Sequence, residues 1–248
     1  FLSAVSKVSA SIKSYNNSLG VMVSLLNLNL NSDFAIFEIG TNNFYEIKKL
    51  TKIVMPHQVI ITNIYPTHLE NFKNTRNVAI EKSDLFNPKY NPNIELLILQ
   101  NSNEDEIYLQ KLSKKYKIKN VITFGKKNNV DYHIQSIKNL NNFLSKIKLK
   151  KKNKLIEFNS PTSFENQSIN IIISLIIFEY NNLKIDSMLS DIKNVPVIEG
   201  RGLFHKLIIN KNIITLIDES YNASPVSMMN CIKYFEQYII KENERKIL

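Results

Sequence analysis

Short uninterrupted runs of apolar residues alternate with amphipathic segments over the first half of the chain. The apolar runs are 34–39, 59–62, 96–99 and 121–124. Continuous apolar character, rather than alternation, is typical of parallel strands that are covered on both faces. The segments with apolar residues at helical spacing are 44–54, 75–86 and 104–117. Asn74 is a candidate N-cap for the second of these helices. The order predicts a three-layer α/β domain with a mostly parallel sheet.

The middle of the chain has a different pattern. Residues 131–137 and 154–158 alternate polar with apolar side chains, which predicts half-exposed antiparallel strands at one edge of the sheet. Residues 166–180 are almost all apolar, so we expect a buried helix there.

Another group of elements is predicted after residue 200. A linker-like segment at 195–200 is followed by two predicted strands, 203–209 and 213–218, which turn near residues 210–212. Ser224 and Pro225 are a favourable N-cap and first residue for a helix. Its apolar stripe consists of Met228, Ile232, Phe235 and Ile239.

Length and composition narrow the class of protein. The 248 residues suit one large domain or two smaller ones, and the change of pattern predicts a central domain over 1–197 and the beginning of a second α/β, Rossmann-like domain over 198–248.

The 44% of hydrophobic residues excludes wholesale disorder. A single cysteine excludes a disulfide framework and a Cys-rich metal site, so we expect a reducing, cytoplasmic location. No apolar run approaches the about 18 residues of a membrane-spanning helix, so no membrane span is expected.

The chain is basic, with 32 Lys and Arg against 22 Asp and Glu and a net charge of +10. A strong positive charge is typical of nucleic-acid-binding proteins. However, the basic runs at 114–119 and 146–154 lack the arginines and the Gly and aromatic pattern of RNA-binding strands. A solvated basic face explains them better, so we expect no nucleic-acid partner. A non-catalytic basic binding module stays open as an alternative, and salt-sensitive binding to RNA would be its test.

Three polar side chains stand near the predicted strand ends, where a parallel sheet keeps its functional groups. Glu38 interrupts the first predicted strand, His68 follows the second by a few residues, and Lys82 lies in the predicted helix 75–86. A carboxylate and an imidazole at neighbouring strand ends could share Mg²⁺, which takes few protein ligands. Spacing alone favours ordinary roles: an ion pair for Glu38, a hydrogen-bonded loop histidine for His68 and a solvent-facing lysine for Lys82.

Several familiar catalytic motifs are absent from the sequence. It has no His-Glu-x-x-His, no cysteine pair and no Gly-x-Ser-x-Gly. It also has no Gly-x-x-x-x-Gly-Lys-[Ser/Thr] phosphate loop, and its 5 glycines are too widely spaced to form one.

Several segments of the chain, in the same order, resemble the ATPase core of the Mur ligases. They are 14–21, 37–42, 61–72, 79–86 and 218–228. The first and last resemble in particular the family members that join D-alanyl-D-alanine to UDP-N-acetylmuramoyl-tripeptide. The resemblance spans nearly the whole chain, so it is more specific than any single motif.

The resemblance implies a metal site. Glu38 and His68 would be magnesium ligands, and Lys82 would be the lysine that the family carbamylates with CO₂. Carbamylation turns this cation into a carboxylate-like ligand for a second Mg²⁺. His68 and Lys82 would be the catalytic residues of this site.

The resemblance also implies a nucleotide site. Asn170 falls where the family holds the adenine of ATP, Arg201 would reach the ATP phosphates, and Asp218 would bind the ribose. Asn16 and Asn17 would lie near the substrate or its phosphates. Tyr221, Asn222 and Pro225 match the family's loop without an assigned role.

The implied reaction is an ATP-dependent amide ligation of peptidoglycan precursor synthesis. ATP converts a peptide carboxylate into an acyl phosphate, and the amine of the dipeptide attacks it and releases phosphate. We expect a monomer. The alternatives are another Mur-type ligase or a folylpolyglutamate-type ligase, and the segment 221–225 argues against both.

The sequence departs from the family in identifiable places. Tyr65 replaces a glycine before the histidine motif, and Asn166 replaces a histidine that lies four residues before Asn170. The phosphate loop and a UDP-binding domain would precede Phe1, and the second domain would continue past Leu248. We therefore expect no ligase activity from residues 1–248 alone.

Overall fold

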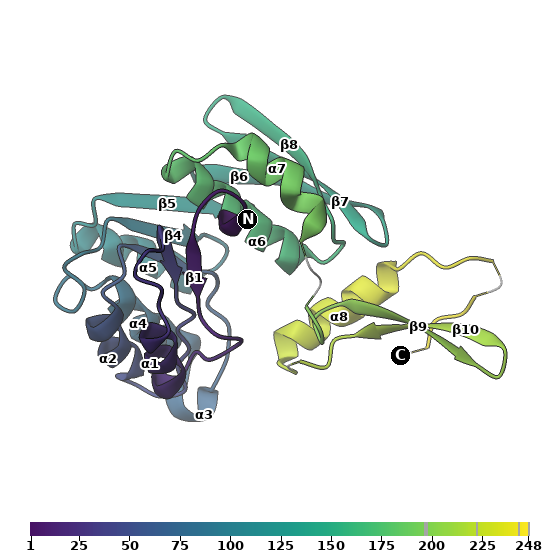
Figure 1. Cartoon of the computed structure of the whole chain (residues 1–248), viewed down its shortest axis with the longest axis horizontal. Coiled ribbons are helices and arrows are strands. Elements are labelled where there is room, and N and C mark those ends of the chain that lie inside the picture. The colour runs from purple at the N-terminus through teal and green to yellow at the C-terminus, as the bar shows by residue number, and fades with distance from the viewer. Residues whose placement is uncertain (196–197, 222, 243, 248) are drawn as a thin grey trace.

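The computed structural model describes residues 1–195, 198–221, 223–242 and 244–247 (Figure 1). Within them the largest sheet has the strand order β3-β4-β5-β6-β7-β8. Its strands are β3 (Gln58–Ile61), β4 (Leu96–Gln100), β5 (Asn120–Gly125), β6 (Tyr132–Asn141), β7 (Leu144–Lys151) and β8 (Lys154–Ser160). The pairs from β3 to β6 are parallel, and β6-β7 and β7-β8 are antiparallel. The predicted α/β class, with antiparallel strands at one edge of the sheet, is confirmed.

Helices cover both faces of this sheet. Leu97 and Leu99 of β4 pack with α4 (Thr75–Ser83) and α5 (Glu104–Lys115), whereas Leu96 and Ile98 pack with α6 (Glu165–Tyr180) and α7 (Ile185–Asp191) on the opposite face (Figure 1). Successive side chains of a strand point to opposite faces, so the continuous apolar run of β4 serves two cores. The three-layer arrangement follows from that run.

Caps and buried faces explain where the central helices lie. Asn74 caps α4 by accepting a hydrogen bond from the Asn77 N–H at 2.9 Å, as predicted. Asn103 and Glu106 form a reciprocal capping box at the start of α5. The predicted helix 166–180 is α6, whose apolar residues are largely buried.

The lysine-rich segment 146–154 contains a strand that sequence analysis did not predict. β7 alternates lysines with Ile147 and Leu149, which are fully buried. Lys146 and Lys148 extend across to the neighbouring strand β8 and form ion pairs with Glu157 at 2.9 and 2.7 Å. The lysines of this segment keep their contact with solvent, as predicted for a solvated basic face, but its alternate residues belong to the core.

The first predicted strand, 34–39, also differs from expectation. β2 covers only Phe34–Ile36 and pairs with β1 (Val8–Ala10) in a separate parallel sheet. Ile36 is 46% exposed, so this strand is not covered on both faces, and Glu38 lies beyond its end rather than inside it. The apolar run was correctly identified as a strand, but its burial and length were overestimated.

Shorter elements connect this framework. They are η1 (Leu2–Ala4), α1 (Ser18–Leu26), α2 (Glu46–Val54), α3 (Leu69–Phe72), η2 (Asp84–Phe86) and η3 (Ile192–Asn194). Within the described ranges, no helix combines the length and the apolar character that crossing a membrane requires.

The C-terminal part forms a hairpin and a helix. β9 (Leu203–Ile209) and β10 (Asn212–Asp218) pair antiparallel, and α8 (Pro225–Gln237) begins after its Ser224 cap. The predicted helix is confirmed, but α8 ends at Gln237, before Ile239, and Met228 and Ile232 of the predicted stripe are 47% and 40% exposed. The buried residue of α8 is Tyr234, because its ring stacks on Phe164 at 4.0 Å.

The C-terminal part contacts the central sheet through specific pairs. Asn142, between β6 and β7, donates to the Ile239 carbonyl at 2.7 Å and accepts from its N–H at 2.8 Å. The predicted boundary at 197 falls on residues 196–197, which lie outside the described residues, so the two-domain division stays a prediction.

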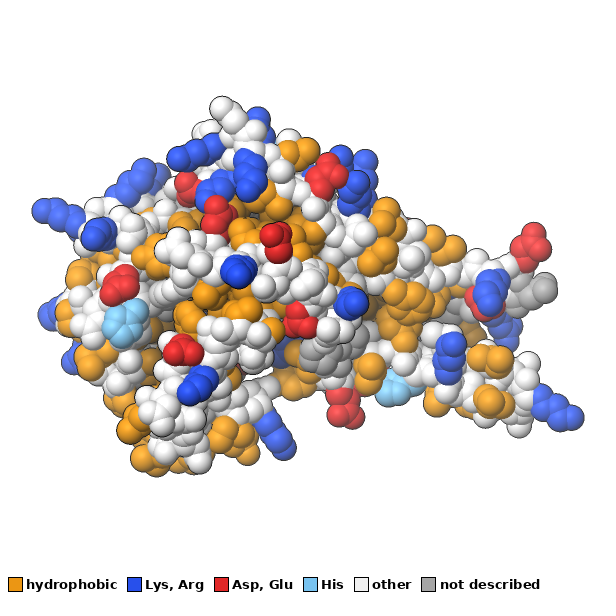
Figure 2. Space-filling view, turned by 45° about the horizontal axis from the view of Figure 1, so that its top comes forward, with side chains coloured by type: hydrophobic (Ala, Val, Ile, Leu, Met, Phe, Trp, Pro, Cys, Tyr) orange, Lys and Arg blue, Asp and Glu red, His pale blue; other side chains and the backbone are white. Residues whose placement is uncertain are grey.

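Charged side chains are dispersed on the face shown in Figure 2. Lys and Arg lie among Asp and Glu there, while apolar side chains gather over the C-terminal hairpin and helix. On this face the positive charge does not form a continuous patch, which favours the solvated basic surface over a nucleic-acid-binding one.

Candidate active site

A cavity of about 980 Å³ gathers all the predicted site residues except Asp218. These residues are Asn16, Asn17, Glu38, His68, Lys82, Asn170 and Arg201. They come from the starts of α1 and α6, the segments after β2 and β3, helix α4 and the C-terminal part. Residues far apart in the chain therefore line one space, beyond the carboxyl end of strand β3.

Glu38 is held against the segment that precedes α1. Asn16 Nδ2 donates to Glu38 Oε1 at 2.8 Å, and the Asn16 carbonyl accepts from the Gly40 N–H at 2.9 Å. A Cβ at Gly40 would lie 2.9 Å from Asn16 Cγ, so glycine is what permits this close approach. Asn17 caps α1 by accepting from the Gly20 N–H at 2.8 Å.

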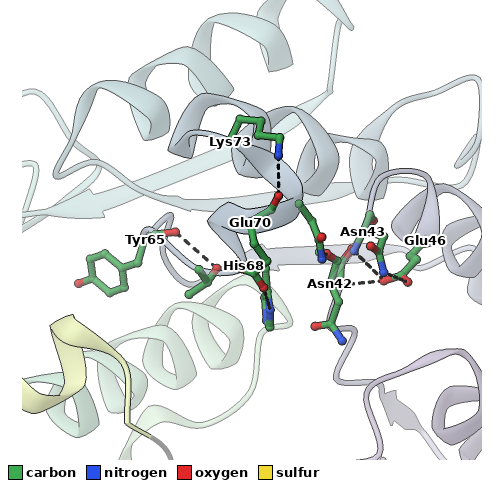
Figure 3. Close-up of polar contacts among 10 residues, drawn as sticks. Asn42, Asn43, Glu46, Tyr65, His68, Glu70 and Lys73 are labelled. Atoms are coloured by element: carbon green, nitrogen blue, oxygen red, sulfur yellow. Dashed lines mark hydrogen bonds and ion pairs between the residues drawn. The ribbon is translucent and has the colours of Figure 1, made fainter.

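The segment after Glu38 is ordered by Glu46 at the start of α2 (Figure 3). Glu46 Oε2 accepts from the Asn42 N–H at 2.8 Å and the Thr41 hydroxyl at 3.2 Å, and Glu46 Oε1 accepts from Asn43 Nδ2 at 3.0 Å. Burial works to raise the pKa of Glu46, but the hydrogen bonds from Asn43, Asn42 and Thr41 outweigh it and hold the pKa below its usual range.

His68 lies in the loop between β3 and α3, and Figure 3 places it in the same loop as Tyr65. Its backbone is left-handed, with φ 51°, and its side chain is 44% exposed, with Nδ1 3.7 Å from Glu70 Oε1. The start of the loop is anchored to α5, because Glu106 accepts from the Ile64 N–H at 3.3 Å.

Lys82 projects from α4 to the backbone of the same loop. Its Nζ donates to the Asn63 carbonyl at 3.1 Å. Burial lowers the pKa of Lys82, and the negative charge of Glu106 acts in the opposite direction. Lowering the pKa of a lysine increases the fraction of neutral amine, which is its nucleophilic form.

The donor set at the cavity fits a Mg²⁺ site better if Lys82 takes part as an anion. Across the described ranges, no group of three or more His, Cys, Asp and Glu side chains could hold a metal ion. Glu38 and His68 supply two donors, and an unmodified lysine ammonium would repel a cation. A carbamate on Lys82 would add oxygen donors of the kind that Mg²⁺ prefers.

Asn170 and Arg201 lie where this cavity adjoins a second one of about 1140 Å³. Arg201 is held from both sides. Gln167 Nε2 donates to its carbonyl at 2.7 Å, and its guanidinium carbon lies 4.3 Å from the centroid of the Tyr221 ring. Tyr221 in turn donates through its hydroxyl to Ser14 Oγ, close to Asn16 in the chain.

Asp218 lines neither of these two cavities. Its carboxylate accepts from the N–H groups of Gly200 and Ser220 at 3.2 and 3.0 Å. Hydrogen bonds, those from Ser220 first, hold the pKa of Asp218 below its usual range. Asp218 therefore orders the loop that carries Arg201, and its contact with a ribose stays a prediction. Asn222 lies outside the described residues.

Two buried carboxylates that support the walls of this cavity were not predicted from the sequence. Glu106 is nine-tenths or more buried and fixes the loop start at Ile64, and its Asn-x-x-Glu spacing from Asn103 was a recognisable capping-box signal. Glu81 is equally buried and accepts hydrogen bonds from the N–H groups of Tyr45 and Ile47. No local sequence pattern predicts the burial of Glu81, because its hydrogen-bond partners lie more than thirty residues away in the chain.

The chain is an α/β protein that belongs to the Mur ligase family, since the model of the Mur ligase middle domain matches residues 1–178. It is 29% identical over 227 residues to the UDP-N-acetylmuramoyl-tripeptide–D-alanyl-D-alanine ligase of Buchnera aphidicola subsp. Baizongia pistaciae, which covers 92% of this chain and 47% of the relative. The chain spans about half the length of the curated relatives it matches.

Solved structures share the fold over nearly the whole chain. MurF from Acinetobacter baumannii superposes with a TM-score of 0.81 at 23% identity, over 96% of this chain and 50% of that one. MurF from Thermotoga maritima, solved in complex with ADP, superposes with a TM-score of 0.79 at 19% identity, over 95% of this chain and 52% of that one.

Proposed function

We propose that the protein containing this chain is an ATP-dependent ligase of peptidoglycan precursor synthesis, joining D-alanyl-D-alanine to UDP-N-acetylmuramoyl-tripeptide. One observation carries the proposal: in a chain of the Mur ligase family, the carboxylate, imidazole, lysine, amide and guanidinium that the family resemblance singled out line a single cavity. The similarity to enzymes of this name over 92% of the chain supports the choice of substrates.

The cavity supplies the groups that phosphoryl transfer needs. Glu38, His68 and carbamylated Lys82 would hold Mg²⁺, which neutralises phosphate charge when bound. Arg201 would place a fixed positive charge on the phosphates, because its guanidinium stays protonated and its fork geometry matches phosphate oxygens. Asn170 can donate and accept hydrogen bonds at once, as recognition of an adenine edge requires.

The second substrate must reach the same space. Asn16 and Asn17 line the same cavity as Lys82, in a segment fixed by Glu38 and by the start of α1. They are therefore placed to contact the carboxylate that becomes the acyl phosphate. Holding two anionic reactants in line is the main catalytic task of such a site.

Phosphate release by the full-length protein tests the proposal. With ATP, Mg²⁺ and UDP-N-acetylmuramoyl-tripeptide present, we expect release on addition of D-alanyl-D-alanine but not of D-glutamate or L-lysine, and no release when a folate and L-glutamate replace the two substrates. The amide product should appear by mass spectrometry in equal amount. Turnover with another amine would assign a different ligase of the same family, and salt-sensitive RNA binding without turnover would favour the basic binding module.

A further inference from the structure

Glu81 is a buried carboxylate beside Lys82 that the proposed reaction does not use. It is 2% exposed. Its Oε2 accepts from the Tyr45 N–H and its Oε1 from the Ile47 N–H, both at 2.8 Å. A carboxylate is rarely this buried without partners, so these two bonds account for its place in the core.

The partners of Glu81 are the first backbone groups of helix α2. The first N–H groups of a helix have no acceptor inside it, and the N-cap residue Tyr45 provides no side-chain cap. Glu81 supplies the missing acceptors from another helix. Its negative charge also lies at the end of α2 where the helix dipole favours an anion.

This contact joins the two walls of the cavity. Helix α2 continues the segment that carries Glu38, and Glu46 keeps that segment ordered through Thr41 and Asn43. Successive side chains of a helix diverge by about 100°. Lys82 can therefore point to the Asn63 carbonyl and the cavity while its neighbour Glu81 points to α2.

We propose that Glu81 is a positioning residue that fixes α4 against the start of α2, so that Lys82 and Glu38 keep the separation a shared cation requires. The inference rests on the proposed function, because it concerns the same metal site. Glu81 acts through geometry rather than through its charge on Lys82. Burial lowers the pKa of Lys82 and the charge of Glu106 opposes that shift, whereas Glu81 is not among its causes.

The variant Glu81→Gln in the full-length protein tests this role. Glutamine keeps the size of the side chain and one acceptor, but it turns an amide NH₂ toward the second N–H. With Mn²⁺ alone as the probe, in bicarbonate buffer, we expect its affinity to fall about 10-fold or more, as for other residues that orient metal ligands. Electron paramagnetic resonance titration gives the affinity, and thermal unfolding is followed in parallel.

Asn74→Ala is the matched control, because it removes a cap from the same helix without touching α2. It should lower the unfolding temperature and leave Mn²⁺ affinity unchanged. Wild-type affinity in Glu81→Gln, or equal loss in Asn74→Ala, would overturn the inference. If Glu81→Gln does not fold, Glu81→Asp, whose shorter side chain cannot reach both N–H groups, is held to the same criterion.

Failure of the metal site itself would look different. Glu38→Ala should weaken Mn²⁺ binding in the otherwise unchanged protein. If Glu38→Ala binds Mn²⁺ as the wild type does, the proposed metal site is wrong whatever Glu81 does. If only Glu38→Ala weakens binding, the site stands and the positioning role of Glu81 falls.

Discussion

Replacement of Lys82 by alanine in the full-length protein should reduce ATP-dependent phosphate release by on the order of 10³-fold, comparable to the loss of an electrostatic catalytic group. Lys82→Arg should be equally impaired, because a guanidinium stays protonated and does not react with CO₂ as a neutral amine does. The wild type should lose activity in buffer freed of CO₂ and regain it on addition of bicarbonate. Steady-state phosphate release measures all three effects.

Lys73→Ala is the control for Lys82. Lys73 lies directly after α3 and donates to the Glu70 carbonyl at 2.8 Å, outside the lining of the cavity, so its loss should leave activity near the wild-type level. Full activity of Lys82→Arg would show that a plain cation suffices and would refute carbamylation. Activity independent of CO₂ would do the same.

Arg201→Ala is expected to lower kcat by about 10³-fold, at the lower end of the effect of arginines that stabilise phosphoryl transfer. Arg201 enters the cavity from the C-terminal part. Gln167 of α6 donates a hydrogen bond to its carbonyl, and the Tyr221 ring packs against its guanidinium. Arg201→Lys should recover little, since an ammonium lacks the planar fork that binds two phosphate oxygens. Initial rates at varied ATP concentration separate kcat from KM.

Arg76→Ala provides the comparison for Arg201. Arg76 pairs with Asp105 at 2.6 Å on the surface of α4, so its removal should leave kcat unchanged. An unchanged kcat in Arg201→Ala, with only KM for ATP raised, would mean that Arg201 binds the nucleotide equally in the ground state and the transition state. That result would contradict its proposed place at the transferring phosphate.

Elements that are buried on two faces or capped locally were predictable from the sequence. β4 needed apolar residues at positions 96–99 because both faces of the sheet are covered, and α4 and α5 begin at asparagine caps. β7 was not predictable in the same way. Its lysines form the polar half of an alternating strand, and the ion pairs with Glu157 that accommodate two of them are non-local.

The candidate site could not be predicted from the spacing of its residues alone. Glu38, His68 and Lys82 lie 30 and 14 positions apart in the sequence, and only the path of the chain through β3 and α4 brings them to one cavity. Spacing alone favoured ordinary roles for all three, whereas the family resemblance selected them. Neither spacing nor the family resemblance identified Glu81. Its hydrogen bonds are to backbone N–H groups, which nearly every residue type has, so its partners leave no mark in the sequence.

The close approach at Gly40 has a consequence for the whole chain. At each of its 5 glycines an added Cβ would lie within 2.9 Å of another atom. The residues met are Tyr15, Asn16, Asn101, Tyr221 and Phe164. In a protein so poor in glycine, every glycine except Gly20 marks a point where two segments distant in the sequence approach each other. The few glycines of the sequence therefore indicate where distant segments pack closely. Several of these contacts lie around the candidate active site.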